Sequence, residues 1–116
     1  TDLAYAFSKA GDQARFDQAM TILNESSLSS LEQGMRSGEL LLVRAAYHTM
    51  AGEQEAALER LAQAIDGGLV VSTKISKQYP YFRELDGNPE FEAIQQRMIE
   101  HLNRERDKLG LEPVEA

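Results

Sequence analysis

Two histidines, His48 and His101, are the side chains best suited to metal binding or general base catalysis. Neither belongs to a spacing such as His-Glu-x-x-His, which would place two ligands on one face of a helix. His48 lies on an apolar helix face, which is typical of a histidine that makes one hydrogen bond in the core or between helices. His101 follows Glu100 in a charged segment, which indicates a position near the surface. We therefore expect no metal site.

Other residue types used in catalysis also lack the patterns that would support it. The chain has no cysteine, so neither a thiol nucleophile nor a disulfide is available. Its serines form no motif such as G-x-S-x-G, and Gly67 and Gly68 lack the Lys-Ser/Thr ending of a phosphate loop. Paired carboxylates are frequent, but on helix faces such pairs normally act as solubilising charge. We expect no catalytic residue, no cofactor and no enzymatic activity.

The net charge of −7 and the sequence pI of about 4.8 argue against direct binding of nucleic acid, because phosphate contacts require clustered Lys and Arg. Basic residues gather at positions 97–108, but acidic residues alternate with them, which favours a salt-bridged surface. No apolar run reaches the ~20 residues of a membrane-spanning helix, so we expect no membrane insertion by this segment. The compartment is open: the cytoplasm is favoured, and the periplasm is the alternative if a parent protein is anchored in a membrane.

Composition predicts an all-α fold. Ala, Leu, Glu, Gln and Arg are frequent, prolines number only 3, and Val70-Val71 is the only strand-like pair. With 116 residues the chain fits one domain, residues 1–116, which can bury roughly two thirds of its unfolded surface. We therefore expect a single helical domain with a modest core.

Residues 39–68 carry the strongest helical pattern, and apolar residues recur there every three or four positions. The pattern predicts two short helices folded back on each other about Gly52, which can adopt the left-handed conformation that ends a helix. Alanines at Ala45, Ala57 and Ala64 would let the two backbones approach closely. We predict a helical hairpin over this stretch.

This spacing resembles a tetratricopeptide (TPR) unit, in which small residues, an aromatic residue and a turn glycine recur along a helical hairpin. His48 occupies the usual tyrosine position, Leu41 replaces the opening tryptophan, and Asp66-Gly67-Gly68 replaces the closing proline. The positions that match the family pattern are Ala45, Gly52, Ala57, Leu61 and Ala64.

A degenerate first copy of the hairpin is indicated at residues 2–26. Gly11 and Ala19 repeat the turn glycine and the alanine that follows it, at a spacing longer than the family period of ~34 residues. The serine-rich stretch 27–38 lies between the two copies and keeps a helical spacing of apolar residues. We predict a short connecting helix there.

The C-terminal part predicts a loop followed by a capping helix. Residues 69–87 lack a sustained helical period, apart from one turn, and hold three aromatic residues, Tyr79, Tyr81 and Phe82. We expect Phe82 and one tyrosine to plug the end of the helical stack while the other tyrosine stays partly exposed. The helix over 88–110 begins with Asn88 as N-cap and Pro89 at its first position, and a tail follows at 111–116. The apolar stripe of this helix consists of Phe91, Ile94, Met98, Leu102 and Leu109.

The stretch from residue 2 to 110 resembles the C-terminal close of TPR regions in bacterial multidomain regulators, such as winged-helix transcription regulators, nucleotide cyclases and kinases. Because the chain opens at Thr1 without a methionine, we expect a fragment of a larger bacterial signalling or transcription-regulatory protein. The resemblance implies a non-enzymatic interaction, scaffold or regulatory module that binds a protein or peptide in a short concave groove. In the family the first helix of each hairpin lines this groove, and the corresponding residues here are Tyr5, Lys9, Glu39, Leu42, Ala46 and Thr49.

Two other functions stay open. The helices could pack onto the rest of the parent chain or form a homodimer, leaving no free groove, and an exposed apolar face on residues 2–10 would favour this structural role. The third alternative is a small-molecule sensor domain with a pocket between Tyr47, Met50, Tyr79 and Phe82. A ligand-induced rise in melting temperature would support that alternative.

Overall fold

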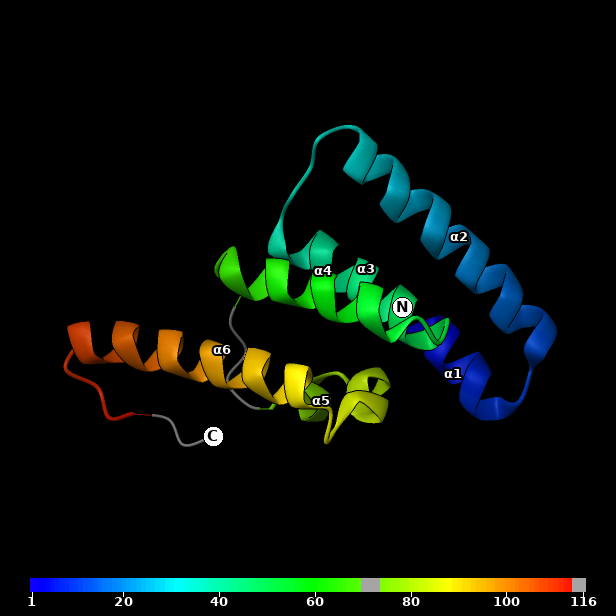
Figure 1. Ribbon diagram of the computed structural model, residues 1–116. Helices are drawn as coiled ribbons and strands as arrows, with labels where there is room; N and C mark the ends of the chain where they lie inside the picture. Colours follow the sequence, from blue (N-terminus) through cyan, green and yellow to red (C-terminus); the bar gives the residue numbers. More distant parts are fainter. Residues whose placement is uncertain (70–73, 114–116) are drawn as a thin grey trace.

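The computed structural model describes residues 1–69 and 74–113, and this part of the chain contains helices and no strand (Figure 1). The predicted all-α fold class is therefore confirmed. The pair Val70-Val71 lies outside the described residues. The elements are the α-helices α1 (Asp2–Ala10), α2 (Gln13–Glu32), α3 (Gly38–Met50), α4 (Gln54–Asp66), α5 (Ile75–Gln78) and α6 (Pro89–Lys108), and the 3-10 helix η1 (Pro80–Leu85).

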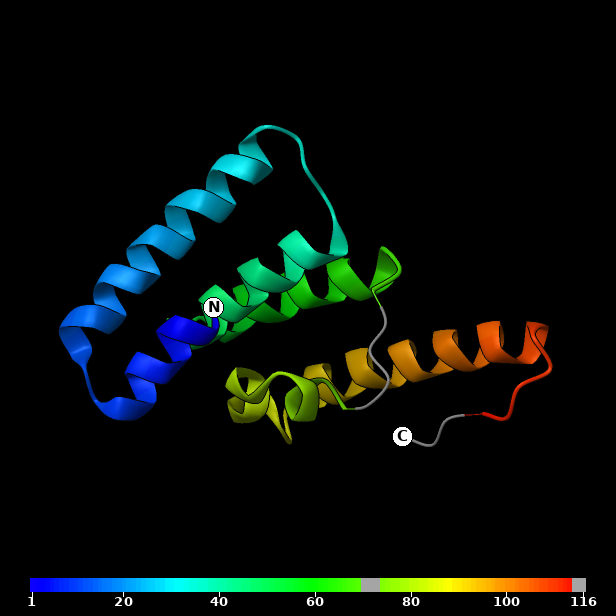
Figure 2. The ribbon, with the colours of Figure 1, turned by 180° about the vertical axis from the view of Figure 1, so that it is seen from behind.

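The helices pack mainly against their neighbours in sequence. α1 contacts α2, and α3 makes the most extensive contact of the structure with α4, to which it is joined by a short turn at Gly52. Gly52 has a left-handed φ of 79°, so the predicted helix stop at this residue is confirmed. Seen from both sides, α6 lies beside α4, and η1 lies at the end of α6 that is closest to α1 (Figures 1 and 2). None of the helices in the described ranges is long and apolar enough to cross a membrane.

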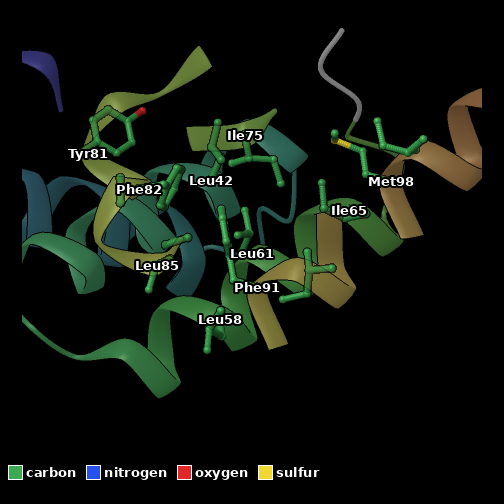
Figure 3. Close-up of a cluster of buried hydrophobic side chains, with 14 residues drawn as sticks. Leu42, Leu58, Leu61, Ile65, Ile75, Tyr81, Phe82, Leu85, Phe91 and Met98 are labelled. Atoms are coloured by element: carbon green, nitrogen blue, oxygen red, sulfur yellow. The ribbon is translucent and has the colours of Figure 1, made fainter. Parts of the chain in front are cut away.

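The main core lies where α3, α4, η1 and α6 meet (Figure 3). Phe82 from η1 and Phe91 from α6 have no exposed surface and are the largest of its fully buried side chains. Ala45 on α3 and Ala57 on α4 have no exposed surface, as expected of small residues where paired helices approach closely. The core cluster consists of Leu42, Ala45, Ala46, Leu58, Leu61, Ile65, Ile75, Tyr81, Phe82, Leu85, Phe91, Ile94, Met98 and Ile99.

The predicted break between a first hairpin at 2–26 and a short connecting helix at 27–38 is wrong, because α2 continues without interruption to Glu32. The hydroxyl of Ser27 donates to the carbonyl oxygen of Leu23 at 2.6 Å, within the helix. A serine that bonds back to the preceding turn does not start a new helix. Leu31 is buried against Leu41 and Ala64, so packing also holds the last turns of α2 in place.

The segment predicted as a loop, 69–87, contains α5 and η1 in its described part. The single helical turn expected there corresponds to α5. The 3-10 helix η1 was not expected, and it contributes Tyr81, Phe82 and Leu85 to the core. Tyr79 is half-buried, so the expectation that Phe82 and one tyrosine are buried while another tyrosine stays partly exposed is confirmed.

Helix α6 begins as the sequence predicts and ends outside the core. The side chain of Asn88 accepts hydrogen bonds from the backbone N–H groups of Glu90 and Phe91, at 2.9 and 3.3 Å, and Pro89 occupies the first turn. Leu109, which the sequence places on the apolar stripe of this helix, does not join the core, since it is 74% exposed. The last turns of α6 extend beyond the end of α4, so no neighbouring helix covers them (Figure 1).

Replacing Phe82 should show that η1 is part of the core and not a surface loop. We expect Phe82→Ala to lower the free energy of unfolding by about 3 to 5 kcal/mol, because it leaves a cavity among fully buried side chains. Urea unfolding followed by circular dichroism measures the change. Leu109→Ala is the control and should change stability by less than about 0.5 kcal/mol. Equal effects of the two substitutions would contradict this assignment of the core.

Candidate functional site

Three of the six residues predicted to line a concave groove are buried within the chain itself. Leu42 and Ala46 belong to the main core cluster, where Leu42 lies beside Phe82 (Figure 3). Thr49 is also buried, and its hydroxyl donates to the carbonyl oxygen of Ala45 at 2.8 Å. The prediction of an open groove along this face of α3 is therefore corrected, because η1 covers it.

The other three predicted residues do not form a groove in its place. The half-buried ring of Tyr5 packs edge-on against Tyr81, with ring centroids 6.0 Å apart. Lys9 is exposed, and its Nζ lies 5.5 Å from the centre of the Tyr5 ring. Glu39 is exposed in the first turn of α3, at the opposite end of that helix from Thr49. Of these three residues, Tyr5 and Lys9 lie together, and Tyr5 also packs against the core cluster that contains Leu42 and Ala46.

η1 cannot move out of the predicted groove to make room for a partner. Phe82 and Leu85 have no exposed surface, and moving them would open the core. Burial raises the pKa of the Tyr81 hydroxyl, and the nearby carboxylate of Asp2 adds to the rise. The hydroxyl therefore stays protonated at neutral pH, and this part of the core carries no charge.

A groove that is open to solvent lies instead between the first half of α2 and the end of α3. Its volume is about 440 Å³, which is within the range of peptide side-chain and small-ligand sites. The lining combines apolar and aromatic groups with hydrogen-bonding groups. The lining residues are Phe16, Asp17, Met20, Thr21, Asn24, Glu25, Tyr47 and Ala51.

Sequence reasoning missed this groove. Phe16 and Met20 lie one turn apart on α2, and Tyr47 and Ala51 lie one turn apart at the end of α3. These paired spacings were a usable signal, but they could equally describe side chains that fill a core. Only the crossing of α2 over α3 leaves space between the two pairs.

Arg44 of α3 fixes one wall of the groove. Its side chain reaches α2, where Nη1 donates to Asn24 Oδ1 at 2.8 Å and to Ser27 Oγ at 3.1 Å. The guanidinium carbon also lies 5.0 Å from the centre of the Tyr47 ring. Arg44 thus connects two residues of the groove lining, Asn24 and Tyr47, and sets the distance between the two helices.

The charge of Arg44 is buried without a carboxylate partner in the described part of the chain. The residue is only 5% exposed, and its Nε makes no hydrogen bond there. Burial lowers the pKa of the guanidinium, and the positive charge of Arg60 lowers it further. An arginine nevertheless stays protonated at neutral pH, so the buried positive charge of Arg44 carries a desolvation penalty there.

His48 extends this polar network toward the surface. Its Nε2 lies 3.4 Å from Arg44 Nη2, and its Nδ1 lies 3.0 Å from Glu53 Oε1. Because a guanidinium can only donate, the neutral tautomer that fits carries its proton on Nδ1 and donates it to Glu53. His48 therefore has the role of a hydrogen-bonded histidine at a helix interface. In residues 1–69 and 74–113, no three His, Asp or Glu side chains lie close enough together to hold a metal ion.

The pocket proposed for a small-molecule sensor is not formed by its four residues. Phe82 is fully buried, and Met50 and Tyr79 pack against the main core. Tyr47 lies on the side of α3 that faces α2, over Arg44. The four side chains therefore do not line one cavity.

Comparisons with known proteins identify no relative. No protein-family model matches the chain, and no curated protein or solved structure does so. The function must therefore be inferred from the grooves and charges of the structure.

Asn24 offers a test of the buried charge, because its side-chain oxygen already faces Arg44. We expect Asn24→Asp to raise the free energy of unfolding by about 1 to 2 kcal/mol at pH 7, since it gives the guanidinium an opposite charge. The new carboxyl group has a folded-state pKa below its unfolded value of about 3.9. Its stabilisation is therefore present above that value and lost as the pH falls through the folded-state pKa. Urea titrations between pH 7 and pH 3 measure both effects.

Asn24→Ala should have the opposite effect and lower stability by about 1.5 to 3 kcal/mol, because Arg44 loses a charge-assisted hydrogen bond. The exposed neighbour Ser26 provides the control, and Ser26→Ala should be nearly neutral. If Asn24→Asp and Asn24→Ala changed stability in the same direction, Arg44 would not be a buried, unpaired charge in solution.

Proposed function

We propose that this chain is a non-enzymatic interaction module that binds a protein or peptide partner in the groove between α2 and α3. The observation that carries the proposal is a solvent-open groove whose lining combines the half-buried Phe16 and Tyr47 and the nearly buried Met20 with the polar groups of Thr21 and Asn24. Aromatic and methionine side chains supply contact area, and the polar groups can orient a bound backbone. The Arg44 network supports the proposal because it holds the two walls at a fixed separation before a partner arrives.

The proposal also covers the kind of larger protein to which the module belongs. The TPR-like residue pattern at 39–68, and the hairpin of α3 and α4 closed at Gly52, support a degenerate helical repeat in a larger bacterial signalling or transcription-regulatory protein. The net charge of −7 supports a partner other than nucleic acid. We therefore place the regulatory event in protein contacts made by the helices.

A structural role is the second candidate, and exposed apolar side chains favour it. Leu3 on α1 is 62% exposed, and Ile22 on α2 is 67% exposed. Both lie on the N-terminal hairpin, the element that would meet a preceding part of a parent chain or a second copy. Packing through this hairpin would leave the groove between α2 and α3 unused.

The absence of cysteine allows the groove to be probed with a single introduced thiol. We expect Thr21→Cys, labelled with a photoactivatable cross-linker, to join covalently to a discrete partner in an extract of the source cells. The Thr21 side chain lines the groove and is exposed, so the label adds no strain to the core. Mass spectrometry identifies the partner, and titration calorimetry with the purified partner measures its affinity.

Ser26→Cys is the matched control, because Ser26 is exposed on α2 but does not line the groove. A partner bound in the groove should cross-link at residue 21 and not at residue 26. Thr21→Arg should then weaken its affinity more than about tenfold while the melting temperature is unchanged. Identical products from both labelled sites, or an unchanged affinity for Thr21→Arg, would rule out this groove.

The structural role predicts self-association through Leu3. In sedimentation equilibrium, the chain should form a dimer at micromolar concentrations, and Leu3→Glu should return it to a monomer, because a charge cannot be buried there without a partner. Leu111→Glu changes an exposed leucine at the other end of the chain and should leave the dimer intact. A monomer at all concentrations would exclude the homodimer.

A further inference from the structure

A second groove runs between α4 and α6, on a different pair of helices from the groove described above. Its volume is about 270 Å³. Leu58 and Ile94 form its floor and are nearly buried, while Ala62 and Ala93 leave its walls low. The groove is thus a shallow apolar channel between two helices.

The two walls present matching helical faces. On α4 the lining residues begin at Glu55 and recur three, four and seven positions later, and on α6 they follow the same spacing from Glu90. Residues at these spacings lie on one face of a helix, and seven positions span roughly 10 Å. Because both helices run in the same direction (Figures 1 and 2), the two faces lie alongside each other. A channel of this form accommodates a third helix laid along it.

The two ends of the channel differ in charge. Glu55 and Glu90 lie at one end and Glu59 lies one turn further along, and in the described part of the chain their carboxylates make no hydrogen bond or ion pair. Arg97 lies toward the other end, 3.5 Å from Asp66. The channel is therefore negative over its apolar floor from the first turns of α4 and α6 as far as Glu59.

Stabilisation of the helices by the helix dipole explains only two of these three carboxylates. Glu55 and Glu90 occupy the first turns of α4 and α6, where a carboxylate interacts favourably with the helix dipole. Glu59 lies one turn further along, outside that favourable region. Its carboxylate adds negative charge to the channel without an evident role in folding.

We propose that this channel docks an amphipathic helix of a protein partner. The docked face carries small apolar residues at helical spacing over Leu58 and Ile94, and Lys or Arg at the end that meets Glu55, Glu59 and Glu90. Charge complementarity selects this occupant, because an acidic or purely apolar helix would leave three carboxylates unpaired at the edge of the contact. The channel shares no lining residue with the groove between α2 and α3, so this inference stands independently of that site.

A library of 16-residue helical peptides displayed on phage tests the channel directly. Selection on the full 116-residue chain, with counter-selection on Ala93→Arg, should enrich peptides that combine an apolar stripe with Lys or Arg at one end. Ala93 is exposed, so the arginine fills the channel without disturbing the core. Fluorescence anisotropy with the enriched peptide, made synthetically, then measures the dissociation constant.

Charge reversal by Glu55→Lys with Glu59→Lys should raise that dissociation constant at least about tenfold, and increasing salt should weaken the wild-type complex. The control is Glu32→Lys with Glu84→Lys, which makes the same change in net charge at exposed positions outside the channel and should leave the affinity within about twofold. Thr21→Arg should also leave it unchanged, which separates this channel from the groove between α2 and α3.

Four outcomes would overturn the proposal. Peptides enriched equally on wild type and Ala93→Arg would show that the channel is not the binding surface. Enriched peptides without basic residues, or an affinity insensitive to charge reversal at Glu55 and Glu59, would show that charge does not select the occupant. Self-association of the chain that is lost in Ala93→Arg would show that a second copy occupies the channel instead.

Discussion

The packing of η1 against α3 is the contact on which the rest of the structure depends. Phe82 and Leu85 are completely buried there, between the hairpin of α3 and α4 and the start of α6. Without them, the apolar face of α3 that carries Leu42 would be exposed to water, and α6 would lose the side chains that join its first turns to α3. A short 3-10 helix thus holds together elements that lie far apart in the sequence.

This contact also decides which surfaces remain for a partner. η1 covers the face of α3 that a TPR protein would offer to a peptide. Two of the hollows that stay open lie elsewhere, one between α2 and α3 and the other between α4 and α6. Both are bordered by carboxylates, which agrees with the net charge of −7 and favours partners that bring positive charge.

Arg44 shows that the packing of α2 against α3 is not optimised for stability alone. A buried guanidinium that hydrogen-bonds to Asn24 and Ser27, with no carboxylate paired directly to it in the described ranges, carries a desolvation penalty that an apolar side chain would avoid. In return, its directional hydrogen bonds fix the crossing of the two helices more specifically than apolar contacts could. For the partner proposed above, a groove wall held in this way would already be in place before binding, which would reduce the entropy lost on association.

The sequence by itself determined the helical class, the turn at Gly52 and the start of α6 at Asn88, because these depend on local propensity, glycine geometry and capping groups within a few residues. It did not determine that α2 continues past Ser27, that Leu109 is exposed or that η1 fills the face of α3. Those features depend on which distant side chains meet, and a periodic apolar face looks the same whether it is covered by another part of the chain or open to a partner. The position of the candidate grooves was therefore decided by tertiary packing, chiefly by the burial of Phe82 and by the crossing of α2 over Arg44.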